Sequence, residues 1–262
     1  MTAPNLMSDD ILLIDKPEGW TSFDVVAKIR GKIRADYLKQ GIKPTKKQLR
    51  VGHAGTLDPF ATGLLIILLG DACKCAGKFL KLDKTYEFTA KLGEVSTTGD
   101  PEGEISKWQI LDSKMQNAKL DKDTVIRRGV SSQINASVAS QISEPTIDEV
   151  ENVLEKFIGE ITQIPPVFSA IKINGQRAYK LAREGKEVEI PPRQVTISRI
   201  ELVEYSYPNL KCVCDVSSGT YIRTLVEDIG KALKTGAYCT HLRRTKVGDF
   251  DISDSVAIDK IV

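Results

Sequence analysis

The chain has 262 residues, of which 41% are hydrophobic and 27% are charged, so it can form a large buried core and is neither a disordered nor a membrane protein. Its 37 Lys and Arg residues nearly balance its 35 Asp and Glu residues, so the net charge of +2 favours no class of partner. The longest apolar run, Leu64–Leu69, is far shorter than the roughly 20 residues of a membrane span, and residues 1–10 contain no leader, so we expect a cytoplasmic protein.

The N-terminal part of the chain predicts three strands and one long helix. Ile11–Ile14 is a short apolar run that ends at a Pro and Gly turn, as strands do. Thr21 or Ser22 can then cap a helix, because Val25, Val26, Ile29 and Ile33 follow at helical spacing. The continuous apolar run within Gly63–Gly70 predicts a buried strand. Polar and apolar residues alternate in Thr85–Leu92, which predicts a half-buried strand with Tyr86, Phe88, Ala90 and Leu92 on its inner face.

The C-terminal part predicts further strands and helices after one polar segment. Residues 106–143 are rich in Ser, Gln, Asn and Lys without a sustained period, so we expect an exposed insertion there. A capping box at Thr146 and Glu149 begins a helix that we expect to close at Gly159, with an apolar stripe of Val150, Leu154, Phe157 and Ile158. The remaining predicted elements are a short helix at Ala178–Glu184, strands at Gln194–Glu204 and Leu210–Val216, and a helix with Ile222, Leu225, Val226, Ile229 and Leu233 inward. Strands and helices interleave without a βαβ rhythm, so the expected class is α+β.

Positive charge is concentrated in one block. Between Lys28 and Arg50, nine basic residues accompany one acidic residue, Asp36, a local excess of eight. Such a block is either a solvated surface or a binding surface for a polyanion such as nucleic acid.

The cysteines predict neither disulfides nor a metal site. There are five of them, an odd number without secretory context, and two pairs are spaced C-x-C. A one-residue gap places both thiols on one face of a strand, whereas structural zinc sites usually leave two to four residues between ligands. We therefore expect buried strand thiols, most clearly at Cys212 and Cys214.

The segment Gly52–Gly63 contains three glycines and a proline, which together specify a non-repetitive backbone, and it carries Asp58. Loops of this kind often hold a functional site. Asp58 precedes Pro59, which favours an extended backbone over a helical one. Its carboxylate either caps or stabilises a turn of the chain or takes part in chemistry. Arg223 falls in the first turn of the last long helix, where the helix dipole disfavours a cation. It pairs either with Glu227 one turn on or with a loop carboxylate such as Asp58, which it would orient and hold ionised.

The inventory of reactive groups excludes several other chemistries. Only His53 and His241 are available, too few for a multi-histidine metal site, and a Ser-His-Asp triad has little to draw on. Glycine-rich nucleotide loops are also missing. We expect neither a cofactor nor a metal.

Several blocks of the chain, in this order, resemble the TruB family of tRNA pseudouridine synthases. They are Lys16-Pro17 with Gly19, the Gly52–Gly63 loop, Lys84–Phe88, Pro165–Lys172, Arg183–Gly185, Ser218–Leu225 and His241–Thr245. Because separate blocks occur together in one order, the resemblance is specific. It implies a pseudouridine synthase fold, with a mixed and mostly antiparallel sheet, flanking helices and a central cleft. The implied activity isomerises the T-loop uridine at position 55 of tRNA.

The resemblance also implies roles for six residues. Asp58 resembles the catalytic aspartate and Arg223 its ion-pair partner, while Tyr86 resembles the aromatic residue that stacks on the base and assists proton removal at C5. His53 resembles a residue that wedges into the RNA, and Tyr221 and Leu242 resemble contacts to the flipped nucleotide. By pattern alone, Tyr86 and Leu242 fit the core better than a site, and His53 fits a loop histidine with a local hydrogen bond. Pseudouridine formation imports no atom and changes no redox state, which agrees with the expected absence of a cofactor.

We expect residues 1–262 to form a single catalytic domain without the small C-terminal RNA-binding (PUA) domain that many relatives carry. RNA affinity would then come from the catalytic domain, and the basic block Lys28–Arg50 is our hypothesis for it. The expected partner is tRNA, bound through its T arm and elbow by a monomer, without an obligate protein partner or a membrane. Two alternatives are an RNA-folding chaperone and the catalytic subunit of a guide-RNA particle.

Overall fold

The structure, a computed structural model, describes residues 10–108, 144–169, 171–173, 176–177 and 190–261. Most of the insertion expected at 106–143, the helix expected at 178–184 and the block Arg183–Gly185 lie outside the described residues. Within the described part, no helix is long and apolar enough to cross a membrane.

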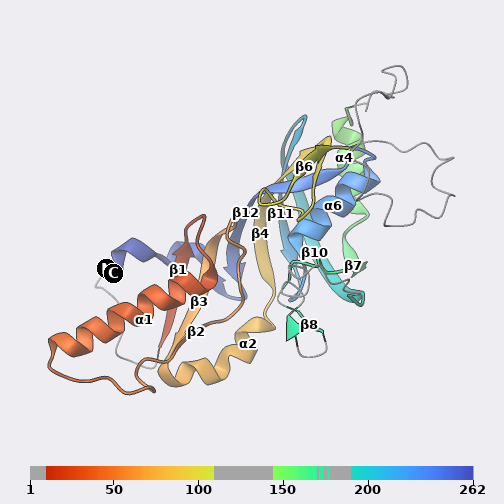
Figure 1. The fold of residues 1–262 in the computed structure, drawn as a ribbon. Helices are drawn as coiled ribbons and strands as arrows, with labels where there is room; N and C mark the ends of the chain where they lie inside the picture. Colours follow the sequence, from red (N-terminus) through yellow and green to blue (C-terminus); the bar gives the residue numbers. More distant parts are fainter. Residues whose placement is uncertain (1–9, 109–143, 170, 174–175, 178–189, 262) are drawn as a thin grey trace.

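One ten-stranded sheet runs through the described part of the chain in the order β14-β1-β3-β12-β4-β11-β10-β7, with β2 added to β3 and β13 to β12 (Figure 1). Its strands are β1 Ile11–Lys16, β2 Val51–His53, β3 Thr62–Leu69, β4 Lys84–Leu92, β7 Gly159–Gln163, β10 Arg193–Ser206, β11 Asn209–Val216, β12 Ala237–Val247, β13 Phe250–Asp251 and β14 Val256–Ala257. Two small hairpins, β5 Glu94–Ser96 with β6 Ile105–Lys107 and β8 Lys172–Ile173 with β9 Gln176–Arg177, form separate two-stranded sheets. Only the pairs β1 with β14 and β12 with β3 are parallel among the described strands, so the expected α+β class with a mostly antiparallel sheet is confirmed.

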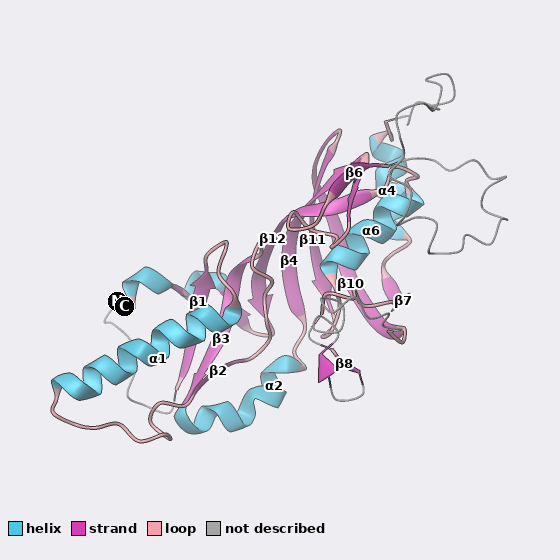
Figure 2. Ribbon diagram, in the orientation of Figure 1, coloured by secondary structure: helices cyan, strands magenta, loops and turns pink. Residues whose placement is uncertain are grey.

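The described helices flank this sheet (Figure 2). They are α1 Ser22–Lys39, α2 Ala76–Leu80, α4 Ile147–Glu155 and α6 Ile222–Ala232, with the short turns η1 Gly70–Cys75, η2 Ile252–Asp254 and η3 Ile258–Lys260. The N-cap of α1 is Thr21, which forms a capping box with Asp24 and so satisfies the first free amides of the helix.

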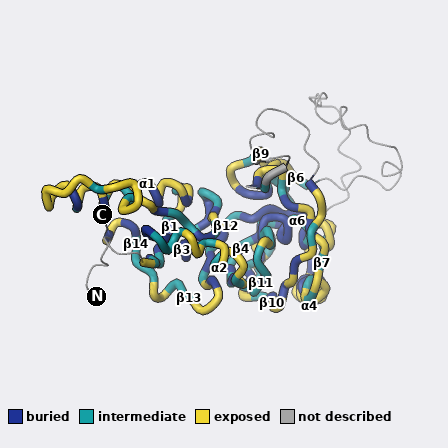
Figure 3. The backbone as a smooth tube through the Cα atoms, turned by 90° about the horizontal axis from the view of Figure 1, so that it is seen from below, coloured by how far each residue is buried: buried dark blue, intermediate teal, exposed yellow. Residues whose placement is uncertain are grey.

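Strand β3 is continuously apolar from Leu64 to Leu69, because both of its faces are covered there. Leu65, Ile67 and Leu69 pack beneath α1, whereas Leu64, Ile66 and Leu68 pack against the η1 and α2 side. The strands and the inner face of α6 form the buried interior in Figure 3.

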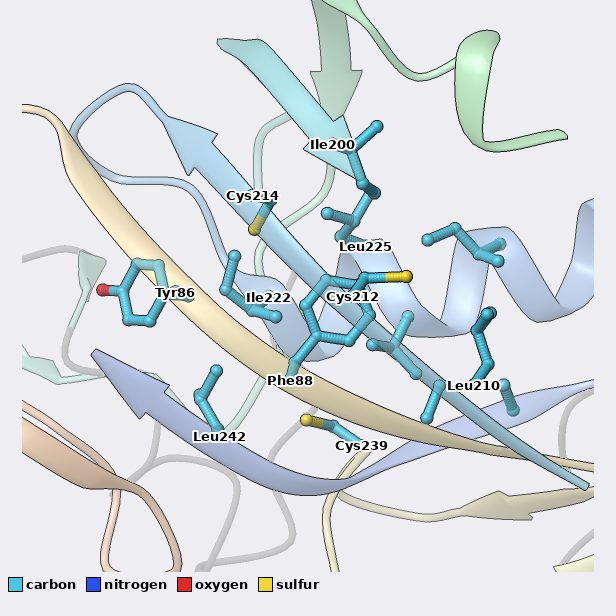
Figure 4. Packing of buried hydrophobic residues seen from close by; sticks show 14 of the residues in the cluster. Tyr86, Phe88, Ile200, Leu210, Cys212, Cys214, Ile222, Leu225, Cys239 and Leu242 are labelled. Atoms are coloured by element: carbon cyan, nitrogen blue, oxygen red, sulfur yellow. The ribbon is translucent and has the colours of Figure 1, made fainter. Parts of the chain in front are cut away.

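The second half of the sheet packs beneath α6 and α4. Strand β4 alternates between buried and half-buried residues as expected, and Phe88 contributes to a cluster with Cys212 and Cys214 of β11 and Leu225 of α6 (Figure 4). The two thiols are buried on one face of their strand, as predicted, and burial raises the pKa of Cys212 to about 12.

The two halves meet at a narrow junction between β3 and β12. Only Thr62 with Arg243 and Gly63 with Arg244 are paired there. Gly63 has φ +102°, and a Cβ atom at this position would overlap the carbonyl oxygen of Arg244, so the close approach of the strands requires glycine. The loop 54–61 crosses this junction and carries the site.

Two sequence predictions are wrong. The helix α4 ends at Glu155 rather than at Gly159, which instead begins β7 with φ +107°, and Ile158 is exposed rather than part of the apolar stripe. The chain turns early because Gly159 pairs with Ile197 of β10. The second pair of cysteines, Cys73 and Cys75, lies on η1 and not on a strand, so Cys73 is half-buried and Cys75 exposed.

Candidate active site

The loop 54–61 is held in place from two sides by buried polar groups. Ser22, the first residue of α1, accepts a hydrogen bond from the amide of Leu57 at 2.8 Å through Oγ and donates to its carbonyl at 3.2 Å. Arg244 of β12 is 1% exposed and donates to the carbonyls of Leu64, Gly55 and Thr56. Neither residue is marked as a loop anchor by its sequence neighbours, and both were missed.

The fully buried Lys16 also holds the loop 54–61 in place. The Nζ atom of Lys16 donates to the carbonyls of Pro17, Trp20 and Pro59, at 2.9, 2.7 and 3.2 Å. Burial lowers the pKa of Lys16 to about 8, although the nearby negative charge of Asp58 opposes the change. This lysine therefore places positive charge near the carboxylate of Asp58.

Asp58 and Arg223 form an ion pair across the junction. The Nε atom of Arg223 lies 3.0 Å from Oδ2 of Asp58, and the arginine side chain is 4% exposed while that of Asp58 is 35% exposed. The arginine is thus the buried, fixed member of the pair, whereas the carboxylate keeps one side open. Of the two partners considered for Arg223, the structure places the loop carboxylate and not Glu227 within ion-pair distance.

The second carboxylate partner of Arg223, Asp100, was not predicted. Its Oδ2 atom lies 3.0 Å from Nη1, and its side chain is 4% exposed. The remaining donors of the guanidinium bond to the carbonyls of Thr98 and Phe168 at 2.9 and 3.0 Å, so every nitrogen of the group has a partner. The only sequence signal was the Thr-Thr-Gly-Asp turn at 97–100, which contains no indication of its distant partner.

The ionisation of Asp58 depends on opposing effects. Burial raises the pKa of its carboxyl group, the Arg223 guanidinium lowers it, the neighbouring Asp100 carboxylate raises it, and Lys16 lowers it. The net direction is upward. Burial likewise raises the pKa of Glu102, which lies near the same carboxylates. The site therefore holds an oriented carboxylate whose proton affinity is higher than in water.

A cleft of about 290 Å³ opens over Asp58. It is lined by Gly55, Thr56, Leu57, Asp58, Leu80, Lys84, Tyr86, Val216, Ser217, Gly219, Thr220, Tyr221, Ile222, Arg223, Leu242 and Arg244. Five of the six residues singled out from the sequence are thus brought together. Tyr86 and Leu242, which are 9% and 5% exposed, lie at the same end of the core cluster, on neighbouring strands (Figure 4).

Tyr221 is fixed at the start of α6. Its backbone amide donates to Oε1 of Gln163 at 2.8 Å, and its carbonyl accepts from Nε2 of the same side chain at 3.0 Å. The guanidinium of Arg193 lies 5.5 Å from the centre of its ring. The buried Gln163, which sequence reasoning missed, thus joins β7 to the wall of the cleft.

His53 is the predicted residue that does not line the cleft. It ends β2, two residues before Gly55, and its predicted contact with RNA stays a prediction. The described residues contain no group of three or more His, Cys, Asp or Glu side chains close enough to hold a metal ion.

Comparison with known proteins gives a consistent family. Residues 42–140 and 127–222 match the family model described as TruB family pseudouridylate synthase (N terminal domain), and residues 223–262 match the tRNA pseudouridylate synthase B C-terminal domain. Proteins named tRNA pseudouridine synthase B from Endomicrobium trichonymphae and Phocaeicola vulgatus are 38% and 40% identical; each alignment covers 97% of this chain, and 94% and 92% of those proteins.

Other relatives are longer than this chain. A protein with the same name from Bifidobacterium longum (strain DJO10A) is 39% identical, and the chain spans 65% of its length. Among solved structures, the crystal structure of a Cbf5-Nop10-Gar1 complex matches with a TM-score of 0.62 and 24% identity, over 97% of this chain and 54% of that one. This last similarity shows the fold alone.

Proposed function

The chain belongs to the TruB family of pseudouridylate synthases, and from this premise we propose that it isomerises a uridine of tRNA to pseudouridine. The supporting observation is the ion pair of Asp58 with the buried Arg223 on the floor of a cleft with aromatic walls. The T-loop uridine at position 55 is the target that the resemblance implies. The reaction breaks the N1–C1′ bond of the uridine and joins the same uracil to C1′ of the same ribose through C5.

In the proposed reaction, Asp58 acts on the ribose. Its carboxylate either attacks C1′, displacing the uracil with the electrons of the N1–C1′ bond, or removes the proton at C2′ as that bond breaks. Both routes need an ionised and oriented carboxylate. Arg223 supplies the orientation, because its guanidinium is fixed by Asp100 and two backbone carbonyls and cannot swing away.

The walls of the cleft would hold the uracil while it turns. A uridine inside a folded RNA loop is reached only after it leaves the stack, so a pocket for an extruded base is required. We assign stacking on the base to Tyr86, together with removal of the C5 proton, and contacts to the flipped nucleotide to Tyr221 and Leu242. His53, at the edge of the loop, is assigned to the RNA fold from which the base departs.

The binding partner in this proposal is the T arm of tRNA, bound by one copy of the catalytic domain. The chaperone activity considered as an alternative would need RNA binding but no bond rearrangement. The guide-RNA alternative has no specific support, because the likeness to the Cbf5 complex shows the fold alone.

The test is release of tritium from T-arm RNA labelled at C5 of the target uridine. We expect release by the wild type and none by Asp58→Asn, with RNA binding retained by both. Glu151→Gln, at an exposed position on α4, is the matched control that loses one carboxylate and should keep full activity. Binding without release by the wild type would contradict the proposal and favour the chaperone.

A further inference from the structure

The segment that joins β3 to β4 presents a row of positive charge to solvent. Lys74 on η1, Lys78 on α2 and Lys81 at the C-cap of α2 are exposed and follow at intervals of four and three residues, and the second interval places Lys78 and Lys81 on the same side of α2. Residues 72–82 contain no acidic side chain. At about 1.5 Å of rise per residue, Lys74 and Lys81 lie roughly 10 Å apart along the segment, about three steps of a stacked nucleic-acid strand at ~3.4 Å per step.

Asp71 joins this row to the basic loop that follows α1. Its carboxylate lies 2.8 Å from Nζ of Lys47, 3.0 Å from Nζ of Lys74 and 3.4 Å from Nη1 of Arg50. Three cations therefore surround one carboxylate, and their side chains are 61%, 68% and 45% exposed. The ion pairs with Lys47 and Lys74 lower the pKa of Asp71 to about 2, so it stays ionised at neutral pH. The three cations outnumber the single carboxylate, so the cluster keeps a net positive charge, and the ion pairs restrict the positions of Lys47, Arg50 and Lys74.

The row ends at the cleft. Leu80 of α2 lines the cleft and lies against the loop 54–61, since a Cβ atom on Gly55 would lie 3.9 Å from Cδ2 of Leu80. Figure 1 shows α2 extending from the β2 side of the molecule toward the base of β4. An RNA strand lying along this segment would therefore arrive beside the proposed uridine pocket.

The charges of α1 are less available. Lys32 is paired with Asp36 at 3.2 Å, and Arg30 donates to the carbonyl of Val51 and so holds α1 against β2. The basic block recognised in the sequence thus divides into a helix whose charges are partly used within the fold and a loop that Asp71 fastens beside Lys74.

We propose that Lys74, Lys78 and Lys81, with Lys47 and Arg50 fastened beside them by Asp71, form a track that binds the phosphodiester backbone of the substrate RNA. This inference rests on the proposed function for the identity of the RNA. The restricted side chains lose less freedom on binding than free lysines would, which increases affinity. Asp71 does not bind the phosphate itself, because its negative charge repels phosphate. It acts as a positioning residue through its ion pairs with Lys47, Arg50 and Lys74.

The first experiment measures binding of an unmodified tRNA transcript over a series of salt concentrations. The variant Lys74→Gln/Lys78→Gln/Lys81→Gln is compared with Lys156→Gln/Lys231→Gln/Lys260→Gln, which removes three exposed lysines elsewhere. The track variant should bind about ten-fold more weakly, and its slope of log affinity against log salt should shrink by about 2, since each lost phosphate contact removes about 0.7 to 0.9. The control should lose much less. Equal losses in both variants would overturn the track.

The second experiment separates position from charge. Asp71→Asn removes a negative charge, so tighter RNA binding is expected if charge alone matters and weaker binding if the carboxylate organises the track. We expect several-fold weaker binding than in Glu151→Gln, with partial rescue by Asp71→Glu; tighter binding would refute the positioning role.

Pseudouridine formation in the same samples distinguishes the two proposals. At saturating RNA the track variant should keep the wild-type kcat while its KM rises. A wild type that binds tRNA but forms no pseudouridine contradicts the proposed function and leaves the comparison of binding intact. A wild type that forms pseudouridine while the track variant binds like the control contradicts the track alone.

Discussion

Replacing Arg223 by lysine tests whether the geometry of the guanidinium, rather than its charge, makes the site work. The guanidinium uses three nitrogens in different directions, toward Asp58, toward Asp100 with the Thr98 carbonyl, and toward the Phe168 carbonyl. A single ammonium group cannot reach all of these positions at once. The substitution therefore keeps the positive charge but releases some of the partners.

The expected losses follow from the number of released contacts. A hydrogen bond to a charged group contributes roughly 1.5 to 3 kcal/mol, so losing two lowers the free energy of unfolding by roughly 3 to 6 kcal/mol. If Asp58 is freed as well, a loss of about 3 kcal/mol in transition-state stabilisation corresponds to about a hundred-fold lower rate, because each 1.36 kcal/mol is a factor of ten.

Single-turnover pseudouridine formation and denaturant unfolding measure the two effects separately. The matched control is Arg199→Lys, since Arg199 also pairs with two carboxylates, of Glu201 and Asp215, but is 43% exposed. Exposed pairs contribute about 0 to 1 kcal/mol, so this control should change neither rate nor stability appreciably. If Arg223→Lys retains the wild-type rate, orientation by the guanidinium is not what the reaction requires.

Three further predictions concern the junction, the ionisation of the site and the thiols. Gly63→Ala should lower the free energy of unfolding by roughly 3 kcal/mol in urea melts, because the new methyl group would meet the backbone of Arg244 at a positive φ. The control Gly77→Ala, whose Cβ atom would have nothing within 4 Å, should raise the free energy of unfolding by about 0.5 to 1 kcal/mol. Equal effects of the two substitutions would contradict the close approach of the strands at Gly63. The single-turnover rate should fall as the pH drops through a midpoint above the ordinary Asp pKa of 3.8, since burial raises the pKa of Asp58 and the carboxylate is the active form. Arg223→Gln should move this midpoint higher, because the Arg223 guanidinium lowers the pKa of Asp58. An unchanged midpoint in this variant would exclude Asp58 as the titrating group. In thiol labelling followed by mass spectrometry, the exposed Cys75 should react first. Burial raises the pKa of the other thiols in the core, which should react only after unfolding: Cys212, Cys214 and Cys239. Early labelling of Cys214 would show that the core opens in the native state.

Elements specified by neighbouring residues were predictable. The N-cap at Thr21, the alternation of β4 and the inward face of α6 all depend on contacts within a few residues, so their signals lie in the local sequence. The end of α4 was not predictable in this way, because Gly159 begins a strand only when β10 is available to pair with it.

The candidate site divides along the same line. Asp58 was marked by its glycine-rich loop and Arg223 by its position in the first turn of a helix, and the family resemblance assigned both a role. Asp100 and Gln163 carried no comparable signal, and Lys16 was marked only as part of a matching block without a role, although each holds a catalytic candidate or its loop in place.

What the sequence determined by itself was the helices α1 and α6, the strands β1, β3, β4, β10 and β11, the α+β class and the family, because these follow from spacing and from blocks of adjacent residues. What only the tertiary structure decided was the network around the carboxylate. Asp100 and Arg223 are 123 residues apart in the chain, and Lys16 and Pro59 are 43 apart. Such contacts depend on strand register and on how two halves of a sheet approach one another, and a charged group becomes buried and oriented only after that packing is complete.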